Sequence, residues 1–473
     1  MAATPTDTPV PREKSPITVK ITNPGIKTAI AYVVETNKAD SLDQDKLSLP
    51  ACSEAQHISV WAPGYYISTF PCNGKARFDY SVSLEAINSA DNPNYTWVDA
   101  DPRTDATRNC ANCHSGQSPN LAEYLEWNQD GHSKALTNPL FWTMYMGMDI
   151  NSNSGPQTQW GISGDEQRIR LTPDAALPNY GPGYHLDYPG DNGNCIYCHV
   201  PAGLPGIAQG VALPDLINNS RGGRINVATE GVTCDVCHKA IDVRLDGNGL
   251  PYLDRPGILS MSFVRPSSFE PFFVGPQPYE SIPDSTVKKT CSPVFSESKF
   301  CAACHYGKFG DVVIYNSYGE WLETSYSKKE IDSKENKNYR SCQDCHMLYD
   351  QKVDGTSPSQ RSACSEANLK LHNFNHNMMN HGPDPDNPAR EIPLLVRKAA
   401  TLSVDEAKMG AGLITFKVTV KNTGAGHKFP TDSPLRELIL YVQVMAQNTS
   451  LPQVSGPTIP RWGALDYAGY PGE

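Results

Sequence analysis

A five-residue run, Cys-x-x-Cys-His, occurs five times in this chain of 473 residues. The copies are CANCH at 110–114, CIYCH at 195–199, CDVCH at 234–238, CAACH at 301–305 and CQDCH at 342–346. Two thiols three positions apart can bond to two substituents on the rim of one flat macrocycle. The histidine beside the second thiol then lies where it can give a nitrogen to a metal at the centre of that ring. The run therefore indicates attachment of a c-type haem.

Two other kinds of site use the same cysteine spacing. A zinc site does not require a histidine directly after every second cysteine. A thioredoxin-like redox pair would not be repeated five times in one chain. We therefore predict five covalently bound haem c groups, held through Cys110, Cys113, Cys195, Cys198, Cys234, Cys237, Cys301, Cys304, Cys342 and Cys345, with iron ligands His114, His199, His238, His305 and His346.

The second axial ligand decides what a haem iron can do, because two strong ligands leave no position for a substrate. Seven histidines lie outside the five runs, which is enough to supply a second imidazole to every iron. His57, in the strand-like QHISVW, is expected to be structural, and His381 remains an alternative ligand. Met378 and Met379 are expected to fill apolar gaps. The expected second ligands are His132, His185, His372, His376 and His427.

The local sequence supports each of these five assignments. His132 opens a helix-like stretch, and His185 lies in a tight loop rich in Gly and Pro. His372 and His376 are four residues apart, so one helical turn would place both on one face. His427 follows a strand-like run, and the two glycines before it would let the backbone approach a ring closely.

The remaining pattern predicts three parts after a flexible lead at 1–15. Residues 16–98 alternate between apolar and polar side chains and predict a β-sandwich-like domain. Residues 99–394 hold all five runs and predict a loop-rich pentahaem cytochrome c domain, since the chain contains 36 Gly and 39 Pro. Residues 395–473 become strand-like again and predict a second sandwich-like segment.

Individual elements can be placed inside these parts. Short helices are expected at 120–128, 132–146 and 318–326. In the last part TFKVTVKN at 415–422 alternates cleanly, and ELILYVQVMA at 437–446 has the composition of a buried strand.

Four cysteines lie outside the runs: Cys52, Cys72, Cys291 and Cys364. An even remainder suggests two disulfides and an oxidising compartment, and four cysteines allow three pairings. We favour Cys52 with Cys72 because both lie in one strand-rich segment. Free buried thiols are the alternative.

Charge and hydropathy exclude several classes of partner. The net charge is −11 with no basic tract, which argues against a nucleic-acid partner. No apolar run approaches the roughly 20 residues of a transmembrane helix. The first residues have neither a basic region nor an apolar core, so they do not read as a signal peptide. The last residues follow a strand-like stretch without a closing element, so we expect the natural chain to continue.

Longer stretches around the runs carry a resemblance to a known group. GVTCDVCHK, FCAACH followed by YGEWLETS, SCQDCHM and NTGAGHKFPTDSPLREL resemble the multihaem c-type cytochromes, and more narrowly the tetrahaem-cytochrome and hydroxylamine-oxidoreductase-like superfamily. The resemblance covers residues 100–440. It implies haem pairs in a conductive chain, mostly with two His ligands per iron, and that His427 may reach a haem. VWAPGYY resembles regulatory-like β-domains that some extracytoplasmic cytochromes carry.

The sequence also departs from this group. Hydroxylamine oxidoreductases carry eight haems, and the Cys-x-x-Cys-Lys run of nitrite reductases is absent here. The resemblance therefore implies an extracytoplasmic electron-transfer protein rather than an enzyme, with low-potential haems. Its partners would be other redox proteins or further copies of itself in a filament. The alternative is an oxidoreductase with one open haem acting on a small nitrogen or sulfur compound. The sequence offers Arg168, Arg170, Arg221 and Arg224 as its charged donors, but the expected role of these side chains is solvated loop charge.

Overall fold

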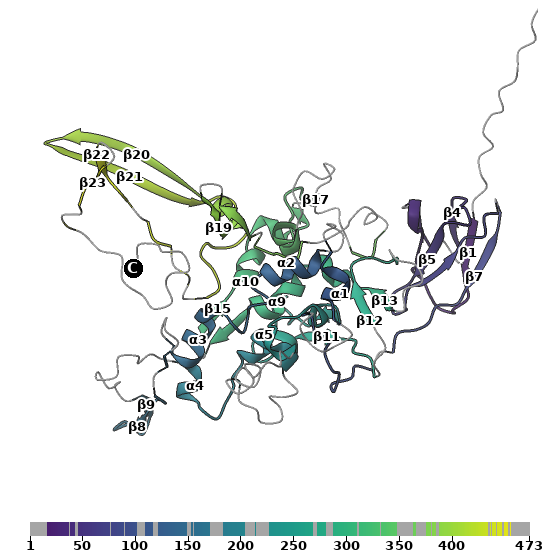
Figure 1. Ribbon diagram of the computed structural model, residues 1–473, viewed down its shortest axis with the longest axis horizontal. Coiled ribbons are helices and arrows are strands. Elements are labelled where there is room, and N and C mark those ends of the chain that lie inside the picture. The colour runs from purple at the N-terminus through teal and green to yellow at the C-terminus, as the bar shows by residue number, and fades with distance from the viewer. Residues whose placement is uncertain are drawn as a thin grey trace, which may run out of the picture.

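The computed structural model contains many small sheets and short helices (Figure 1). It describes residues 17–455 except 37, 43–45, 76, 89, 102–108, 117–121, 149–152, 155, 171–182, 204–212, 214–226, 268–271, 281–286, 310–311, 332, 348–362, 366–374, 380, 385–386, 434–435, 437, 441, 447–448 and 453–454.

The N-terminal part is built from two small sheets around one apolar core. One sheet has the order β4-β1-β7 and the other β3-β2-β5-β6. Strand β1 pairs antiparallel with β4 and parallel with β7. The strands are β1 (Ile17–Ile21), β2 (Ile30–Val33), β3 (Lys38–Ser41), β4 (Lys46–Leu49), β5 (His57–Trp61), β6 (Ser68–Pro71) and β7 (Asp79–Val82).

Alternation along β1 and β4 places one row of their side chains inside. In β4 the pattern is exposed, buried, exposed, buried, so that Leu47 and Leu49 face the core. They pack with Val19, Val60 and other residues of a single continuous cluster. A disulfide joins Cys52 to Cys72, as expected from the sequence, and its two cysteines belong to the same cluster.

The central part consists of short helices and two-stranded ladders. Its helices are α1 (Ala111–His114), α2 (Glu123–Gln129), α3 (Pro139–Met146), α4 (Tyr184–Asp187), α5 (Ile196–His199), α8 (Cys234–Cys237), α9 (Lys299–His305), α10 (Ser317–Leu322) and α11 (Cys342–His346). Its strands are β8 (Trp160–Ile162), β9 (Arg168–Arg170), β10 (Ala240–Val243), β11 (Met261–Phe263), β12 (Phe272–Gly275), β13 (Lys288–Cys291), β14 (Gly307–Phe309), β15 (Val312–Tyr315), β16 (Glu330–Ile331) and β17 (Lys334–Glu335).

The three expected helices are present with shifted bounds. Helix α2 begins later than expected, and α10 ends earlier. The expected helix at 132–146 is divided, because residues 132–137 form turns and α3 begins only at Pro139. The side chain of Asn138 caps α3 by accepting from the Leu140 amide, so the local sequence starts a new helix there.

The C-terminal part differs from the expected second sandwich. Strands β18 (His381–Asp384) and β19 (Asn387–Pro393) and helix α12 (Leu394–Ala399) lead into a long hairpin of β20 (Ala400–Gly410) and β21 (Leu413–Asn422). The hairpin extends away from the body, and its side chains Leu402, Val404, Ile414 and Phe416 are exposed (Figure 1). No second layer covers it among the described residues.

The expected buried strand at 437–446 is also wrong for most of its length. Among the described residues of this stretch, the last two alone form a strand, β22 (Met445–Ala446), which pairs with β23 (Thr449–Ser450). Leu438, Leu440 and Val442 are about half exposed. Their composition suits a buried strand, but none of the sheets formed by the described residues pairs with them.

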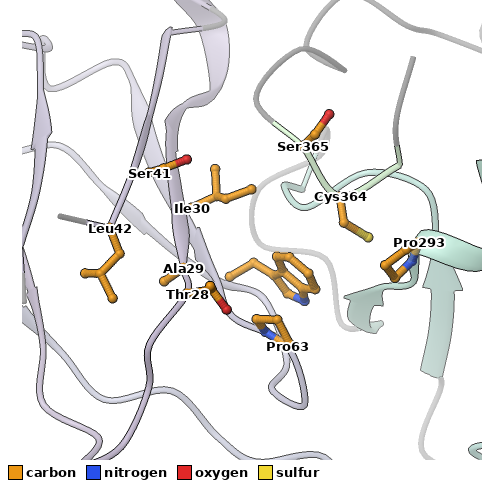
Figure 2. Close-up of a pocket in the computed structure, with 10 residues that line it drawn as sticks. Thr28, Ala29, Ile30, Ser41, Leu42, Pro63, Pro293, Cys364 and Ser365 are labelled. Carbon is orange, nitrogen blue, oxygen red and sulfur yellow. The ribbon is translucent and has the colours of Figure 1, made fainter. Parts of the chain in front are cut away.

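The N-terminal and central parts meet around the second disulfide, Cys291–Cys364. A groove of about 530 Å³ lies at this junction and is lined mainly by apolar side chains. Figure 2 shows Ile30 and Pro63 on one side and Pro293 and Cys364 on the other. The indole Nε1 of Trp61 donates to Thr290 Oγ1 at 3.2 Å, which links the two parts by a buried hydrogen bond.

In the described part of the chain, none of the helices combines the length and apolar character needed to cross a bilayer.

Candidate functional site

Each Cys-x-x-Cys-His run folds as one short helical turn with the histidine at or just after its end. Residues three apart lie on the same helical face, so both thiols of each run point to one side. Two of the turns are capped by side chains: Thr233 accepts from the Val236 amide, and Ser341 and Asp344 form a capping box. The local sequence thus fixes the geometry of the attachment residues.

All five histidines of the runs use Nδ1 in a hydrogen bond to an oxygen acceptor. The acceptors and distances are Glu123 Oε2 for His114 (3.0 Å), the Ala135 carbonyl for His199 (2.7 Å), the Val274 carbonyl for His238 (2.9 Å), Asp432 Oδ2 for His305 (3.0 Å) and the Met378 carbonyl for His346 (3.1 Å). An imidazole whose Nδ1–H donates keeps its Nε2 lone pair for a metal. This arrangement is typical of metal-binding histidines.

Three of these histidines face a second imidazole from outside the runs. The ring centroids lie 6.1 Å apart for His305 and His132, 6.2 Å for His346 and His427, and 6.3 Å for His238 and His376. The structure therefore brings together three of the expected second ligands with three of the expected first ligands.

These separations can be compared with the space that one metal ion needs. An imidazole nitrogen binds a metal at about 2.0–2.1 Å, so two nitrogens on opposite sides of one ion lie about 4 Å apart, and the two ring centroids lie about 6.3 Å apart. Direct ring stacking would bring the centroids closer than this, as for His199 and Phe141 at 4.4 Å. The donor set and spacing of the three pairs therefore fit an iron held between two histidines.

Buried acidic groups and a close backbone contact hold His132. Asp130 Oδ1 accepts from His132 Nδ1 at 2.6 Å and also from the His132 amide at 2.9 Å. Burial acts to raise the pKa of Asp130, but these bonds outweigh it and lower the pKa to about 2. Gly231 has φ +69°, and a Cβ there would lie 2.4 Å from the His132 carbonyl. Only glycine fits this position.

The segment that carries His427 reaches two of the runs. His427 faces His346, and Asp432, five residues later, accepts from His305 Nδ1. Asp432 also accepts from the amide and the hydroxyl of Ser317. Burial acts to raise the pKa of Asp432, but the bonds from His305 and Ser317 lower it below its usual range. The side chain therefore stays ionised and fixes the orientation of the His305 ring.

Burial keeps several of the ring nitrogens neutral, which is the form that binds metals. It lowers the pKa of His199 and of His346. The pKa of His238 falls to about 3, because the ring is buried and because His376 lies beside it. For His132 burial acts in the same direction, but the carboxylate of Asp130 raises the pKa.

The two other attachment histidines have different surroundings. For His114 and His199, the described residues provide no imidazole at the spacing of the three pairs. His199 stacks on Phe141, and the expected ligand His185 stacks on Tyr145 at 5.4 Å. These two aromatic rings of α3 also stack on each other, so a column of rings links His185 to His199.

The remaining candidates separate clearly. His372 lies outside the described residues. His57 donates from Nδ1 to Glu35 Oε1 at 2.7 Å within the N-terminal domain, far along the chain from the runs. His381 is bound to Asn377 Oδ1 at 3.1 Å. Met378 contributes its backbone carbonyl to His346.

The carboxylates that orient the histidines were missed by the sequence interpretation. Asp432 lies in the GAGHKFPTD stretch that was singled out for His427, and Asp130 is two residues before His132. Proximity in sequence could have suggested Asp130. Nothing in the sequence indicates that Asp432 contacts His305, since 127 positions separate them.

The described residues contain no group of three or more His, Cys, Asp or Glu side chains arranged around a common metal position. No family model matches the chain, and no curated protein and no solved structure matches it either.

Proposed function

We propose that this protein is an electron-transfer protein of the multihaem c-type cytochrome kind, with five covalently attached haem c groups. The attachment residues are the ten cysteines of the runs. His114, His199, His238, His305 and His346 would bind the irons on one side. Haem supplies a centre that accepts and releases single electrons. The protein residues attach it, orient it and set its potential.

The observation that carries this proposal is the spacing of the three imidazole pairs, 6.1–6.3 Å between centroids. His132, His376 and His427 would close the second side of the irons at His305, His238 and His346. Two imidazoles on one iron leave no position for a substrate and favour a low potential. This supports electron transfer over catalysis at these three positions.

Intact-mass measurement of the protein made in a host that attaches haem c tests the proposal directly. The expected mass is that of the chain with two disulfides and five haems. Serine at Cys342 and Cys345 together should remove one haem, whereas serine at Cys52 and Cys72 should remove none. A chain mass without bound haem would contradict the proposal.

The compartment and the partners follow from the same chemistry. The two disulfides favour an oxidising location outside the cytoplasm. The natural partners would be other redox proteins that donate or accept single electrons. The exposed apolar side chains of β20 and β21 favour association with further polypeptide, including further copies of this chain in a filament. Electron microscopy of the purified protein would distinguish filaments from single particles.

A second candidate function is an oxidoreductase with one open haem, acting on a small nitrogen or sulfur compound. It is favoured by His114, whose side chain is 45% exposed and which faces no second imidazole among the described residues. Carbon monoxide binding to the reduced protein separates the two functions. Stoichiometric binding at one of five haems would favour the enzyme, and absence of binding would favour electron transfer alone.

A further inference from the structure

The fourth run, in α9, adjoins the fifth run in α11. The thiols of Cys301 and Cys342 lie next to each other. The start of α11 also packs on the start of α9, because the Cys342 amide donates to Ser298 Oγ at 3.0 Å. The side chain of Gln343 donates to the Glu297 carbonyl at 2.9 Å. Two attachment turns are therefore fastened side by side.

The same helix adjoins the second run in α5 through its other cysteine. The thiol of Cys304 lies next to that of Cys198. Both α5 and α9 pack against the short helix η5 (Gly257–Leu259). Gly257 has φ +58°, and a Cβ there would lie 2.2 Å from the Tyr197 carbonyl, so the backbones of η5 and α5 are in direct contact.

The fourth run also adjoins the third run. Cys237 lies near both Cys304 and Cys301. Strand β10, which follows the third run directly, packs against α9. Val243 of β10 and Ala303 of α9 belong to one buried apolar cluster.

The first run reaches this group only through the third run, as far as the described residues show. The thiol of Cys110 lies next to that of Cys234. Both cysteines pack against the same cluster, which contains Ala111 and Trp127. The first run therefore adjoins the third run at the cysteine opposite to the one that faces α9.

We propose that the five attachment runs form a branched set rather than a single file, with the fourth run at the junction and the first, second and fifth runs at three separate ends. This inference rests on the proposed function. Each cysteine sulfur would be bonded to the rim of its own macrocycle, so thiols in contact bring two rims together. The protein would then exchange electrons with partners at three places rather than two.

The branching can be tested by measuring how the charge on one haem changes the midpoint potentials of its neighbours. Adding one electron to a haem makes its neighbours harder to reduce, and this Coulomb effect falls with distance. Replacing a histidine ligand by methionine raises the potential of that haem. In H132M, the haem at His305 is reduced first, with one electron taken from the electrode. The haems at its neighbouring runs should then titrate at lower potential.

A spectroelectrochemical titration of the holoprotein, with the haems resolved by electron paramagnetic resonance, measures these shifts. For H132M we expect the midpoint potentials of three other haems to shift, whereas the potential of the haem at His114 stays unchanged. The matched variant is H427M, which alters the haem at His346 at one end. In this variant we expect the midpoint potential of one other haem to shift. A shift of the midpoint potential at only two other haems in H132M, or at more than one other haem in H427M, would overturn the branched arrangement.

A gentler pair of variants covers the case in which H132M or H427M fails to fold. D432N weakens the carboxylate that orients His305, and E123Q does the same for His114; each should raise the potential of its own haem. The midpoint potentials of three further haems should shift in D432N, and that of one further haem should shift in E123Q. Equal numbers would overturn the proposal. The intact mass of the wild-type protein tests the proposed function separately from the branched arrangement. If the chain does not bind haem, this mass lacks five haems before any variant is compared.

Discussion

The N-terminal domain and the central part solve the problem of a stable interior in different ways. In the N-terminal domain, fifteen buried apolar residues form one cluster between two sheets. In the central part, the buried apolar residues are divided among several small clusters, and each of the attachment cysteines is partly or fully exposed. The first domain has a core of its own side chains. The second has its apolar groups arranged around the cysteines and histidines.

This difference has a physical consequence for folding. Ordering each residue costs about 1–2 kcal/mol of conformational entropy, which burial of apolar surface has to offset. The N-terminal strands can meet this cost with their own side chains. Short single-turn helices such as α5 and α8 cannot, since isolated helices of that length are unstable in water. The proposed haems would supply the missing apolar surface.

The largest expected effect comes from withholding haem. In protein produced without haem attachment, amide hydrogen exchange should become fast in α5, α8, α9 and α11, because their apolar partner is missing. Amides of β2 and β5 should remain protected as in the holoprotein. Equal protection of the attachment helices with and without haem would remove the distinction between the two regions.

A cavity in the N-terminal core tests the opposite side of the comparison. Leu47→Ala should lower the free energy of unfolding of this domain by about 2–5 kcal/mol, since Leu47 is fully buried. The number of bound haems should stay the same. Denaturant unfolding, monitored by amide hydrogen exchange or by fluorescence, measures the free energy of unfolding of the domain. Intact mass measures the number of bound haems. Lys46→Ala, at the exposed neighbouring position of β4, is the control and should have little effect.

A buried carboxyl beside the first and third runs should make the central part sensitive to pH. Glu230 accepts from the amides of Ala100 and Asp101 at 2.9 Å each. Burial and the nearby Asp99 and Asp101 raise its pKa to about 7, above the ordinary value of 4.5. The unfolded chain therefore ionises first, and the stabilisation present below pH 4.5 is lost as the pH rises to about 7.

The expected loss is up to about 3 kcal/mol, because one pKa unit corresponds to about 1.4 kcal/mol. Glu230→Gln cannot ionise and keeps an acceptor for one of the amides. Its free energy of unfolding should rise relative to that of the wild type between pH 4 and pH 8, as measured by urea denaturation at several pH values. A difference that is constant over this range would show that Glu230 titrates normally.

The smallest effects are expected at the contact between the two regions. Thr290→Val leaves the buried Trp61 Nε1–H without its acceptor and should cost about 1–3 kcal/mol. Lys288→Gln breaks the ion pair with Glu85, whose side chain is 63% exposed, and should cost less than about 1 kcal/mol. Thermal unfolding of both variants tests whether the regions are joined mainly by the buried hydrogen bond. A larger effect for Lys288→Gln would reverse that ranking.

Local features of this protein could be predicted well from the sequence. The alternation in β1 and β4 follows from side chains pointing to opposite faces of a strand. The Cys52–Cys72 disulfide was expected because both cysteines lie between strands of one small domain, and the structure confirms it. Helices α2 and α10 were expected within a few residues of their observed bounds.

The predictions failed where a neighbour distant in sequence decides the conformation. The stretch at 437–446 has the composition of a buried strand, but a strand needs a partner that supplies ladder hydrogen bonds, and the described residues pair only Met445–Ala446. The division of the expected helix at 132–146 has a local cause instead, because the Asn138 side chain caps α3, which begins at Pro139.

The sequence by itself determined the spacing of the thiols and the adjacent histidine on which the proposed haem attachment depends, because this spacing is local to one short helix. Only the tertiary structure decided that His132 faces His305, that His376 faces His238 and that His427 faces His346. It also decided that Asp432 orients a histidine 127 positions away and that α9 lies beside three other runs. These relations depend on the path that connecting loops of unequal length take in space. The pattern of residue types along the sequence does not specify that path.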